Sequence, residues 1–214
     1  MTGRLGAQLR LYLITDAALC RRHGLIETVR EAVTGGVTMV QLRDKTATTA
    51  QRVEMALALG DVLSGTGVPL VVNDDVDAAL AAKADGVHIG QSDIDVQHAR
   101  QMIGPDKILG LSCETQQHVR DADPKLVDYL GLGPVFETAT KSDHAAAIGL
   151  KRLVDMVALS SVPTVAIGGL TAAHKDMVKA SGANGLAVVS AICGQGDVLA
   201  AARAFGTNVQ ERAT

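Results

Sequence analysis

Cationic side chains follow two apolar runs of this 214-residue sequence, in the segments QLRDK (41–45) and TATK (138–141). They are Arg43, Lys45 and Lys141. An arginine presents a planar fork of donors to phosphate oxygens, and a lysine presents a compact positive charge. If these side chains converge, they form a site for a multiply charged anion such as pyrophosphate.

Two carboxylates follow other apolar runs: Asp74 lies in VNDD and Asp93 lies in HIGQSD. At a shared site they would repel each other unless a cation lay between them. Mg²⁺ is typically held by one or two carboxylates, while phosphate oxygens and water complete its octahedron. The sequence therefore predicts Mg²⁺ as a cofactor and pyrophosphate as a leaving group that the metal and the cations stabilise.

A second anion site is indicated by Gly168-Gly169, by Leu170-Thr171 and by Ser190-Ala191. Glycines let the backbone approach a ligand closely, and free N–H groups at the start of a helix bind phosphate. One site that holds both a pyrophosphate and a monophosphate suits a reaction that joins two phosphorylated molecules with loss of pyrophosphate.

The elements that must position these residues can be read from apolar runs rich in β-branched residues, most of them preceded by Gly or Pro. Segments with helical spacing, such as 48–65, separate the runs. Strands are expected over 11–15, 38–43, 69–74, 86–90, 108–113, 129–135, 163–169 and 185–192.

This alternation predicts an α/β fold, a single (β/α)8 TIM barrel, with a doubly wound open sheet as the alternative. Polar residues follow almost every strand, as a ring of loops would require, and no GxGxxG opens the first helix. Both features favour the barrel, whose chemistry lies at the C-terminal ends of its strands. We expect an N-terminal extension over 1–10 that could be flexible, the catalytic barrel over 11–206 and a C-terminal tail over 207–214.

The composition excludes several classes of protein. Hydrophobic residues make up 47% of the chain and the formal net charge is −3, which fits a globular domain without a nucleic-acid surface. There is no apolar run of about eighteen residues that could span a membrane. The N-terminus lacks the apolar segment of a signal peptide, and the cysteines are few and scattered, so we expect a cytoplasmic protein.

Each candidate residue also has a simpler explanation. Arg43 and Lys45 could be solvated loop charges, Asp74 and Asp93 could cap helices, and His88 could be a buried, hydrogen-bonded histidine. These explanations weaken together, because every candidate falls at the same end of successive strands.

Seven segments, in this order, resemble the motifs of the thiamine-phosphate synthase family: QLRDK, VNDDVDAAL, DGVHIGQSD, GLSCET, GPVFETATK, VAIGG and VVSAI. The resemblance runs from about residue 11 to residue 206. It implies a Mg²⁺-requiring (β/α)8 barrel that joins 4-amino-2-methyl-5-(hydroxymethyl)pyrimidine diphosphate to a hydroxyethylthiazole phosphate. The products would be thiamine phosphate and pyrophosphate.

The resemblance also implies a role for each matching residue. The diphosphate contacts would be Arg43, Lys45, Asn73, Ser112 and Lys141, of which all but Asn73 would be catalytic. The metal ligands would be Asp74 and Asp93, and the pyrimidine pocket would include Gln41 and His88. The thiazole phosphate would lie against Thr138, Thr140, Gly169, Val189 and Ser190. No role is assigned to the loop 142–147, which contains His144.

The mechanism implied by the resemblance is dissociative: pyrophosphate leaves first, and the thiazole nitrogen captures the resulting pyrimidine methyl cation. Such a reaction needs charge stabilisation and exclusion of water more than acid or base catalysis. A thiazole tautomerase is the nearest alternative, but that family lacks the counterparts of Asp93 and of the Thr-x-Thr-Lys block. A non-catalytic phosphate-binding barrel would show a gap among the charged positions, and none is found. We expect no nucleic-acid or membrane partner, and homo-oligomerisation is left open.

Overall fold

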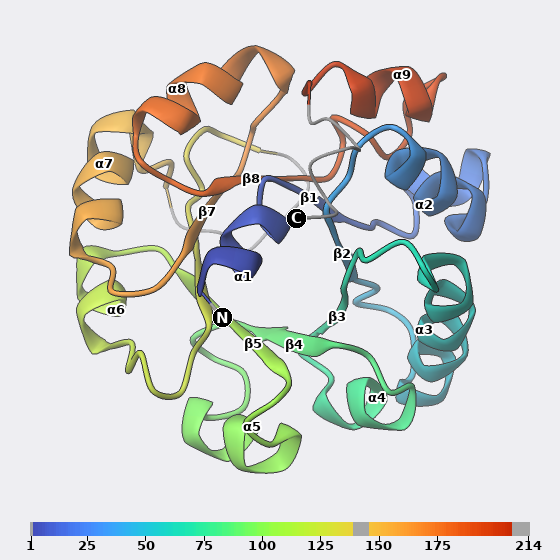
Figure 1. The fold of residues 1–214 in the computed structure, drawn as a ribbon, viewed down its shortest axis with the longest axis horizontal. Helices are drawn as coiled ribbons and strands as arrows, with labels where there is room; N and C mark the ends of the chain where they lie inside the picture. The colour runs from blue at the N-terminus through green and yellow to red at the C-terminus, as the bar shows by residue number, and fades with distance from the viewer. Residues whose placement is uncertain (1, 139–145, 207–214) are drawn as a thin grey trace.

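Eight short parallel strands close a barrel in the order of the sequence (Figure 1). The computed structural model describes residues 2–138 and 146–206. The strands are β1 (Leu11–Ile14), β2 (Met39–Leu42), β3 (Leu70–Asn73), β4 (Gly86–Ile89), β5 (Ile108–Cys113), β6 (Tyr129–Leu132), β7 (Thr164–Ile167) and β8 (Gly185–Val188). Because β1 pairs with β8, with Leu11 opposite Leu186, the predicted barrel is confirmed and the open sheet is excluded.

Helices cover the outer face of the barrel (Figure 1). They are α2 (Leu25–Thr34), α3 (Thr49–Leu63), α4 (Val76–Ala81), α5 (Val96–Ile103), α6 (Gln116–Asp121), α7 (Gly149–Leu159), α8 (Lys175–Ala180) and α9 (Val198–Arg203). Two 3₁₀ turns, η1 (Leu19–Arg22) and η2 (Ala172–His174), precede α2 and α8. No helix in the described part of the chain is both long and apolar enough to cross a membrane.

Five of these helices have an N-cap residue whose side chain accepts a hydrogen bond from the backbone N–H three residues later. The capping residues are Thr48, Asp75, Asp95, Thr115 and Asp197. Such caps satisfy backbone donors that have no partner within the helix. They fix where each helix starts, and they leave Asp74 and Asp93 without a capping role.

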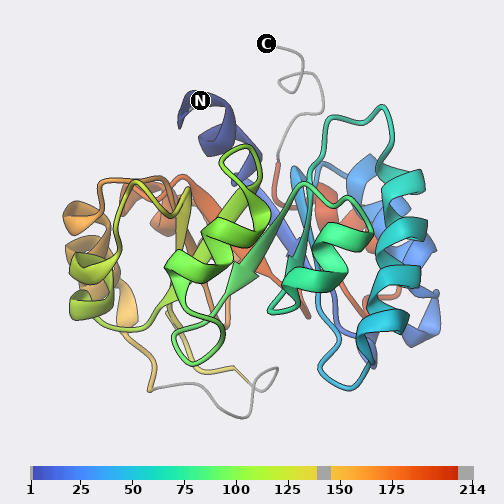
Figure 2. The same ribbon diagram turned by 90° about the horizontal axis from the view of Figure 1, so that it is seen from below.

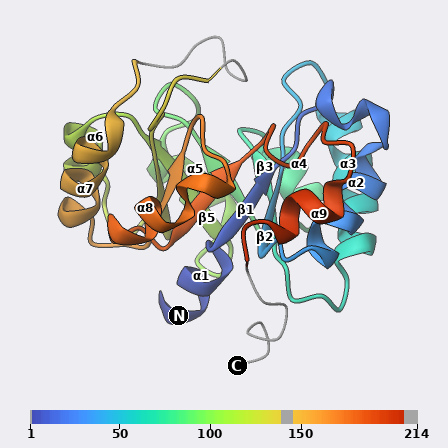
Figure 3. The same cartoon turned by 90° about the horizontal axis from the view of Figure 1, so that it is seen from above.

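Apolar side chains form one layer between the strands and the helices and a second, smaller cluster inside the barrel. The interior cluster contains Tyr12 and Tyr129, which are the only tyrosines of the sequence. Helix α1 (Thr2–Gln8) lies across the N-terminal end of the barrel (Figures 2 and 3), where Leu5 packs against this cluster beside the fully buried Leu9. The interior is therefore closed at one end, and the candidate functional residues lie at the other.

Candidate active site

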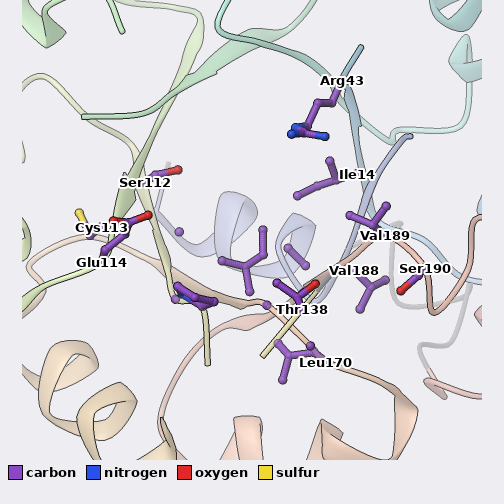
Figure 4. A pocket seen from close by; sticks show the side chains of 17 residues that line it. Ile14, Arg43, Ser112, Cys113, Glu114, Thr138, Leu170, Val188, Val189 and Ser190 are labelled. Atoms are coloured by element: carbon purple, nitrogen blue, oxygen red, sulfur yellow. The ribbon is translucent and has the colours of Figure 1, made fainter. Parts of the chain in front are cut away.

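A cavity opens at the C-terminal ends of the strands, where the sequence predicts the chemistry (Figure 4). Its walls come from the C-terminal ends of β1, β5, β6, β7 and β8 and from the segment after β2. Its lining includes Arg43, Ser112, Glu114, Thr138, Gly168, Gly169, Val189 and Ser190. Arg43 and Ser112 reach toward the opening from different sides (Figure 4).

A second hollow adjoins this cavity and shares three of its residues: Arg43, Ser112 and Glu114. Its remaining walls come from the loops after β2, β3 and β4. They carry Lys45, Asn73, Asp74, Gln91 and Asp93. Two of the three predicted cations, Arg43 and Lys45, thus line one hollow with the predicted carboxylates Asp74 and Asp93. Residues of the predicted glycine-rich anion site line the other.

Arg43 lies on the wall between the two hollows. Only 8% of the residue is exposed, and its backbone N–H donates to the Thr15 hydroxyl at 3.0 Å. Its buried Nε has no hydrogen-bond partner within residues 2–138 and 146–206. A buried donor without an acceptor is costly, so this side chain is suited to receive an anionic ligand.

The glycine pair Gly168-Gly169 adopts left-handed backbone conformations, with φ of 98° and 64°. A Cβ on Gly168 would lie 2.5 Å from Pro134 Cβ, and one on Gly169 would lie 2.6 Å from the carbonyl oxygen of Glu137. Only glycine fits these positions without strain, and this allows β6 and β7 loops to approach each other beside the cavity.

Backbone donors at this end of the cavity remain available. Within the described residues, the N–H groups of Gly169, Leu170, Ser190 and Ala191 have no hydrogen-bond partner. The segment after Leu170 begins with the 3₁₀ turn η2 rather than with the predicted helix, and the Thr171 N–H donates to His174 Nδ1 at 3.1 Å. The candidate anion site therefore consists of two loops whose amides have no partner within the described residues, and helix α8 starts farther away.

Asp74 and Asp93 line the same hollow, and neither caps a helix. Asp74 has a φ of 62°, a left-handed conformation that is uncommon outside glycine and marks a backbone held by its surroundings. Asp93 Oδ2 accepts a hydrogen bond from the Gly90 N–H at 2.7 Å, which fixes the carboxylate at the end of the β4 loop. The carboxylates of Asp74 and Asp93 and the side-chain amide of Asn73 line this hollow and offer oxygen ligands of the kind that a hard cation prefers.

Gln41 and His88, which are predicted to line the pyrimidine pocket, are buried, line neither of the two hollows and are connected through the two tyrosines. Gln41 Nε2 donates to the Tyr12 hydroxyl at 2.7 Å, and the hydroxyls of Tyr12 and Tyr129 are 2.8 Å apart. His88 Nδ1 lies 2.9 Å from the Tyr129 hydroxyl, and its Nε2 lies 2.9 Å from Ser112 Oγ. His88 is therefore a buried, hydrogen-bonded histidine, as its simpler explanation predicts.

Sequence reasoning missed this connection, although one signal was present. Tyr12 and Tyr129 are the only tyrosines in a chain that contains just 2% aromatic residues. A buried phenol needs a hydrogen-bond partner, so isolated tyrosines on two apolar strands indicate a polar group between them. Glu114 was also left without a role, and it lines both hollows.

The cysteines are free and buried. Burial raises the pKa of Cys113 to about 12, so this thiol stays protonated and behaves as a small hydrophobic residue. Cys20 and Cys193 lie 173 residues apart in the sequence, but their sulfur atoms are 3.5 Å apart because the closed barrel brings the loops after β1 and β8 together.

Three residues singled out from the sequence, Thr140, Lys141 and His144, lie outside the described residues. Their assignments stay predictions. Thr138, directly before this segment, lines the cavity as expected.

The fold and the site define a (β/α)8 barrel enzyme with two adjoining hollows at the C-terminal ends of its strands. Residues 11–192 match the family model described as thiamine monophosphate synthase. The chain belongs to this family and is a transferase.

Individual relatives agree with this assignment. A thiamine-phosphate synthase of Psychrobacter sp. (strain PRwf-1) is 52% identical over 194 residues, which cover 88% of this chain and 90% of the relative. Its counterpart in Chloroflexus aurantiacus is 50% identical over 198 residues, or 91% and 89% of the two chains. A solved thiamine phosphate pyrophosphorylase from Pyrococcus furiosus is 36% identical and superposes with a TM-score of 0.86, covering 98% of this chain and all of that one (100%).

Proposed function

We propose that this transferase joins a 4-amino-2-methyl-5-(hydroxymethyl)pyrimidine diphosphate to a hydroxyethylthiazole phosphate, giving thiamine phosphate and pyrophosphate. The observation that carries the proposal is the pair of adjoining hollows, which share Arg43 and Ser112. One hollow offers cations and carboxylates for a diphosphate, and the other offers glycines and free amides for a monophosphate.

The bond that breaks is the one between the pyrimidine methylene carbon and the bridging oxygen of the diphosphate. The electron pair leaves with pyrophosphate, and the thiazole nitrogen then gives its lone pair to the methylene carbon. No proton transfer is required, so the enzyme has to stabilise the departing charge. Arg43, Lys45, Asn73 and Ser112 are the described residues proposed to do this, with Lys141 as a further candidate. Preorganised donors of this kind are usually the largest contribution to such catalysis.

Mg²⁺ fits the donor set of the same hollow. Asp74 and Asp93 would hold the ion, and diphosphate oxygens and water would complete its octahedral shell. When bound, the ion would neutralise charge on the diphosphate and so make it a better leaving group.

The thiazole phosphate would bind at Thr138, Gly169, Val189 and Ser190, against the free amides of the β7 and β8 loops. Binding there would hold the thiazole nitrogen near the methylene carbon, so that capture of the cation is faster than attack by water. The apolar walls that Ile14, Val188 and Leu170 add to this cavity would help to keep water out.

The test combines the two phosphorylated heterocycles with the protein, with and without Mg²⁺, and measures pyrophosphate and thiamine phosphate. We expect both products in equal amounts, and formation should depend on Mg²⁺. If the thiazole phosphate is merely isomerised without release of pyrophosphate, the protein is a tautomerase. If both compounds bind and neither changes, the barrel is a non-catalytic binding protein.

A further inference from the structure

A continuous hydrogen-bonded chain crosses the barrel interior from β2 to β5. Its members are Gln41, Tyr12, Tyr129, His88 and Ser112, joined by contacts of 2.7, 2.8, 2.9 and 2.9 Å. Gln41, Tyr12, Tyr129 and His88 are buried, with exposed fractions of 2%, 1%, 0% and 8%. Only the Ser112 end lines both hollows of the candidate active site.

The two glycines of β5 and β6 make room for this chain. A Cβ on Gly110 would lie 2.2 Å from Tyr129 Cζ and 2.4 Å from His88 Nδ1. A Cβ on Gly131 would lie 3.3 Å from His88 Cε1. Any larger residue at position 110 would displace the contact between the imidazole and the phenol, so the backbone is built around the chain.

The direction of the hydrogen bonds follows from the Gln41 end. An amide nitrogen can donate but cannot accept, so the Tyr12 oxygen is the acceptor there. If Tyr129 also donated to Tyr12, the Tyr12 proton would have no acceptor among the described groups, at a buried position where a missing hydrogen bond is costly. Tyr12 therefore donates to Tyr129.

The hydrogen bonds between Tyr129 and Ser112 take their direction in the same way. Tyr129 has accepted from Tyr12, so its own proton goes to His88 Nδ1. A neutral imidazole with an accepting Nδ1 carries its hydrogen on Nε2, and this N–H donates to Ser112 Oγ. The hydroxyl hydrogen of Ser112 is then left to point into the hollows.

We propose that Tyr12 and Tyr129 are positioning residues: through His88, they fix the Ser112 hydroxyl as a hydrogen-bond donor to the leaving diphosphate. The catalytic half of this proposal rests on the proposed function, whereas the direction of the chain does not. Burial raises the pKa of both phenols above the ordinary tyrosine value, so both keep the protons that the chain requires.

The direct test is the tautomer of His88, read from the ¹⁵N shifts of histidine-labelled protein and assigned by the signal that His88→Gln removes. In the wild type we expect a protonated Nε2 and an unprotonated, accepting Nδ1. In Tyr129→Phe, Nδ1 loses its donor and the two tautomers should mix. Gln41→Met, which removes the first donor of the chain, should have the same effect, and it serves as a second variant if Tyr129→Phe does not fold.

Steady-state kinetics test the consequence for turnover. Tyr129→Phe should lower kcat about 10-fold, the size expected when a partner that orients a functional group is lost. The KM for the thiazole phosphate should stay unchanged, because its proposed contacts come from other residues. Met39→Leu alters a buried apolar side chain of the same interior cluster and is the matched control, with wild-type tautomer and kcat expected.

The outcomes separate the two proposals. A wild-type His88 with its hydrogen on Nδ1 would overturn the direction of the chain, whatever the enzyme catalyses. A mixed tautomer in Tyr129→Phe with unchanged kcat would overturn the positioning role. The predicted tautomer in a protein that makes no thiamine phosphate would overturn the proposed function and leave the chain in place.

Discussion

Arg43 has a buried donor that lowers the stability of the fold and that is proposed to bind an anionic ligand. It is buried at the junction of the two hollows, and its Nε lacks an acceptor within the described residues. The segment QLRDK predicts a phosphate contact from residue type alone. That the side chain is buried and incompletely paired could not be predicted, because this depends on how the strands close around it.

We predict that Arg43→Met lowers kcat by about 100-fold or more, as expected for removal of a preorganised donor. Its free energy of unfolding should be equal to or higher than that of the wild type, because a buried unsatisfied donor costs about 1–3 kcal/mol. Urea unfolding and an assay of pyrophosphate release measure the two quantities.

Arg100→Met is the matched control for Arg43→Met. Arg100, on α5, donates to the carbonyl oxygens of Leu126, Gly104 and Lys107 and forms an ion pair with Asp128 at 2.6 Å. Its loss should lower the free energy of unfolding by about 1–3 kcal/mol and leave kcat unchanged in the folded protein. The reverse pattern for the two variants would refute a ligand-binding role for Arg43.

At the scale of elements, the β3–α4 connection divides two adjacent carboxylates between two tasks. Asp75 caps α4 by accepting from the Ala78 N–H at 2.9 Å, and it pairs with Arg52 of α3 at 2.9 Å. Asp74 turns into the hollow with a left-handed backbone. From the sequence VNDD alone, either aspartate could be the N-cap of α4. Only the observed backbone conformation shows that Asp75 is the cap and that Asp74 is not.

The lowered pKa of Asp75 makes its contribution to the stability of the fold depend on pH. Partial burial acts to raise this pKa, but the Ala78 amide and the side chains of Arg52 and Thr49 outweigh it and hold the pKa below the ordinary 3.8. A lowered pKa stabilises the fold above the pKa of the unfolded chain, and this contribution is lost as the pH falls.

Asp75→Ala should therefore cost about 1 kcal/mol of unfolding free energy at pH 7, the typical value of an N-cap, and less at pH 3. Urea unfolding at both pH values measures the difference. Asp74→Asn, which tolerates the left-handed backbone, should change stability by less than about 0.5 kcal/mol and should reduce Mg²⁺-dependent turnover. A stability loss confined to Asp74→Asn would show that the two roles have been exchanged.

At the scale of the whole molecule, the barrel follows from the alternation of eight apolar runs with helical segments, and every predicted strand is present. The structure shortens most of them, because residues such as Thr15 and Arg43 already belong to the loops that form the site. Contacts that depend on closure, such as Cys20 with Cys193 and Tyr12 with Tyr129, cannot be located from the local sequence, although the two isolated tyrosines indicate a polar group inside the barrel. They join positions that only the pairing of β1 with β8 and the filling of the barrel interior bring together.

Ligand binding should stabilise the entire barrel, since the hollows exist only in the folded state. Pyrophosphate with Mg²⁺ at 100 times its dissociation constant should add about 2.7 kcal/mol, or about 5–10 °C in Tm for a chain of this size. Thermal unfolding measures the shift with pyrophosphate, Mg²⁺ or both.

The same experiment on Asp93→Asn tests the metal. Without this carboxylate, the part of the Tm shift that requires Mg²⁺ should be lost, whereas the part caused by pyrophosphate alone should remain. An equal shift in wild type and variant would remove Asp93 from the metal site.

The most direct test of the two-hollow arrangement is a crystal structure with Mg²⁺, pyrophosphate and thiamine phosphate bound together. The arrangement predicts pyrophosphate against Arg43 and Ser112, the metal at Asp74 and Asp93, and the phosphate of thiamine phosphate at Gly169 and Ser190. Phosphates bound outside these hollows, or both products competing for a single hollow, would contradict it.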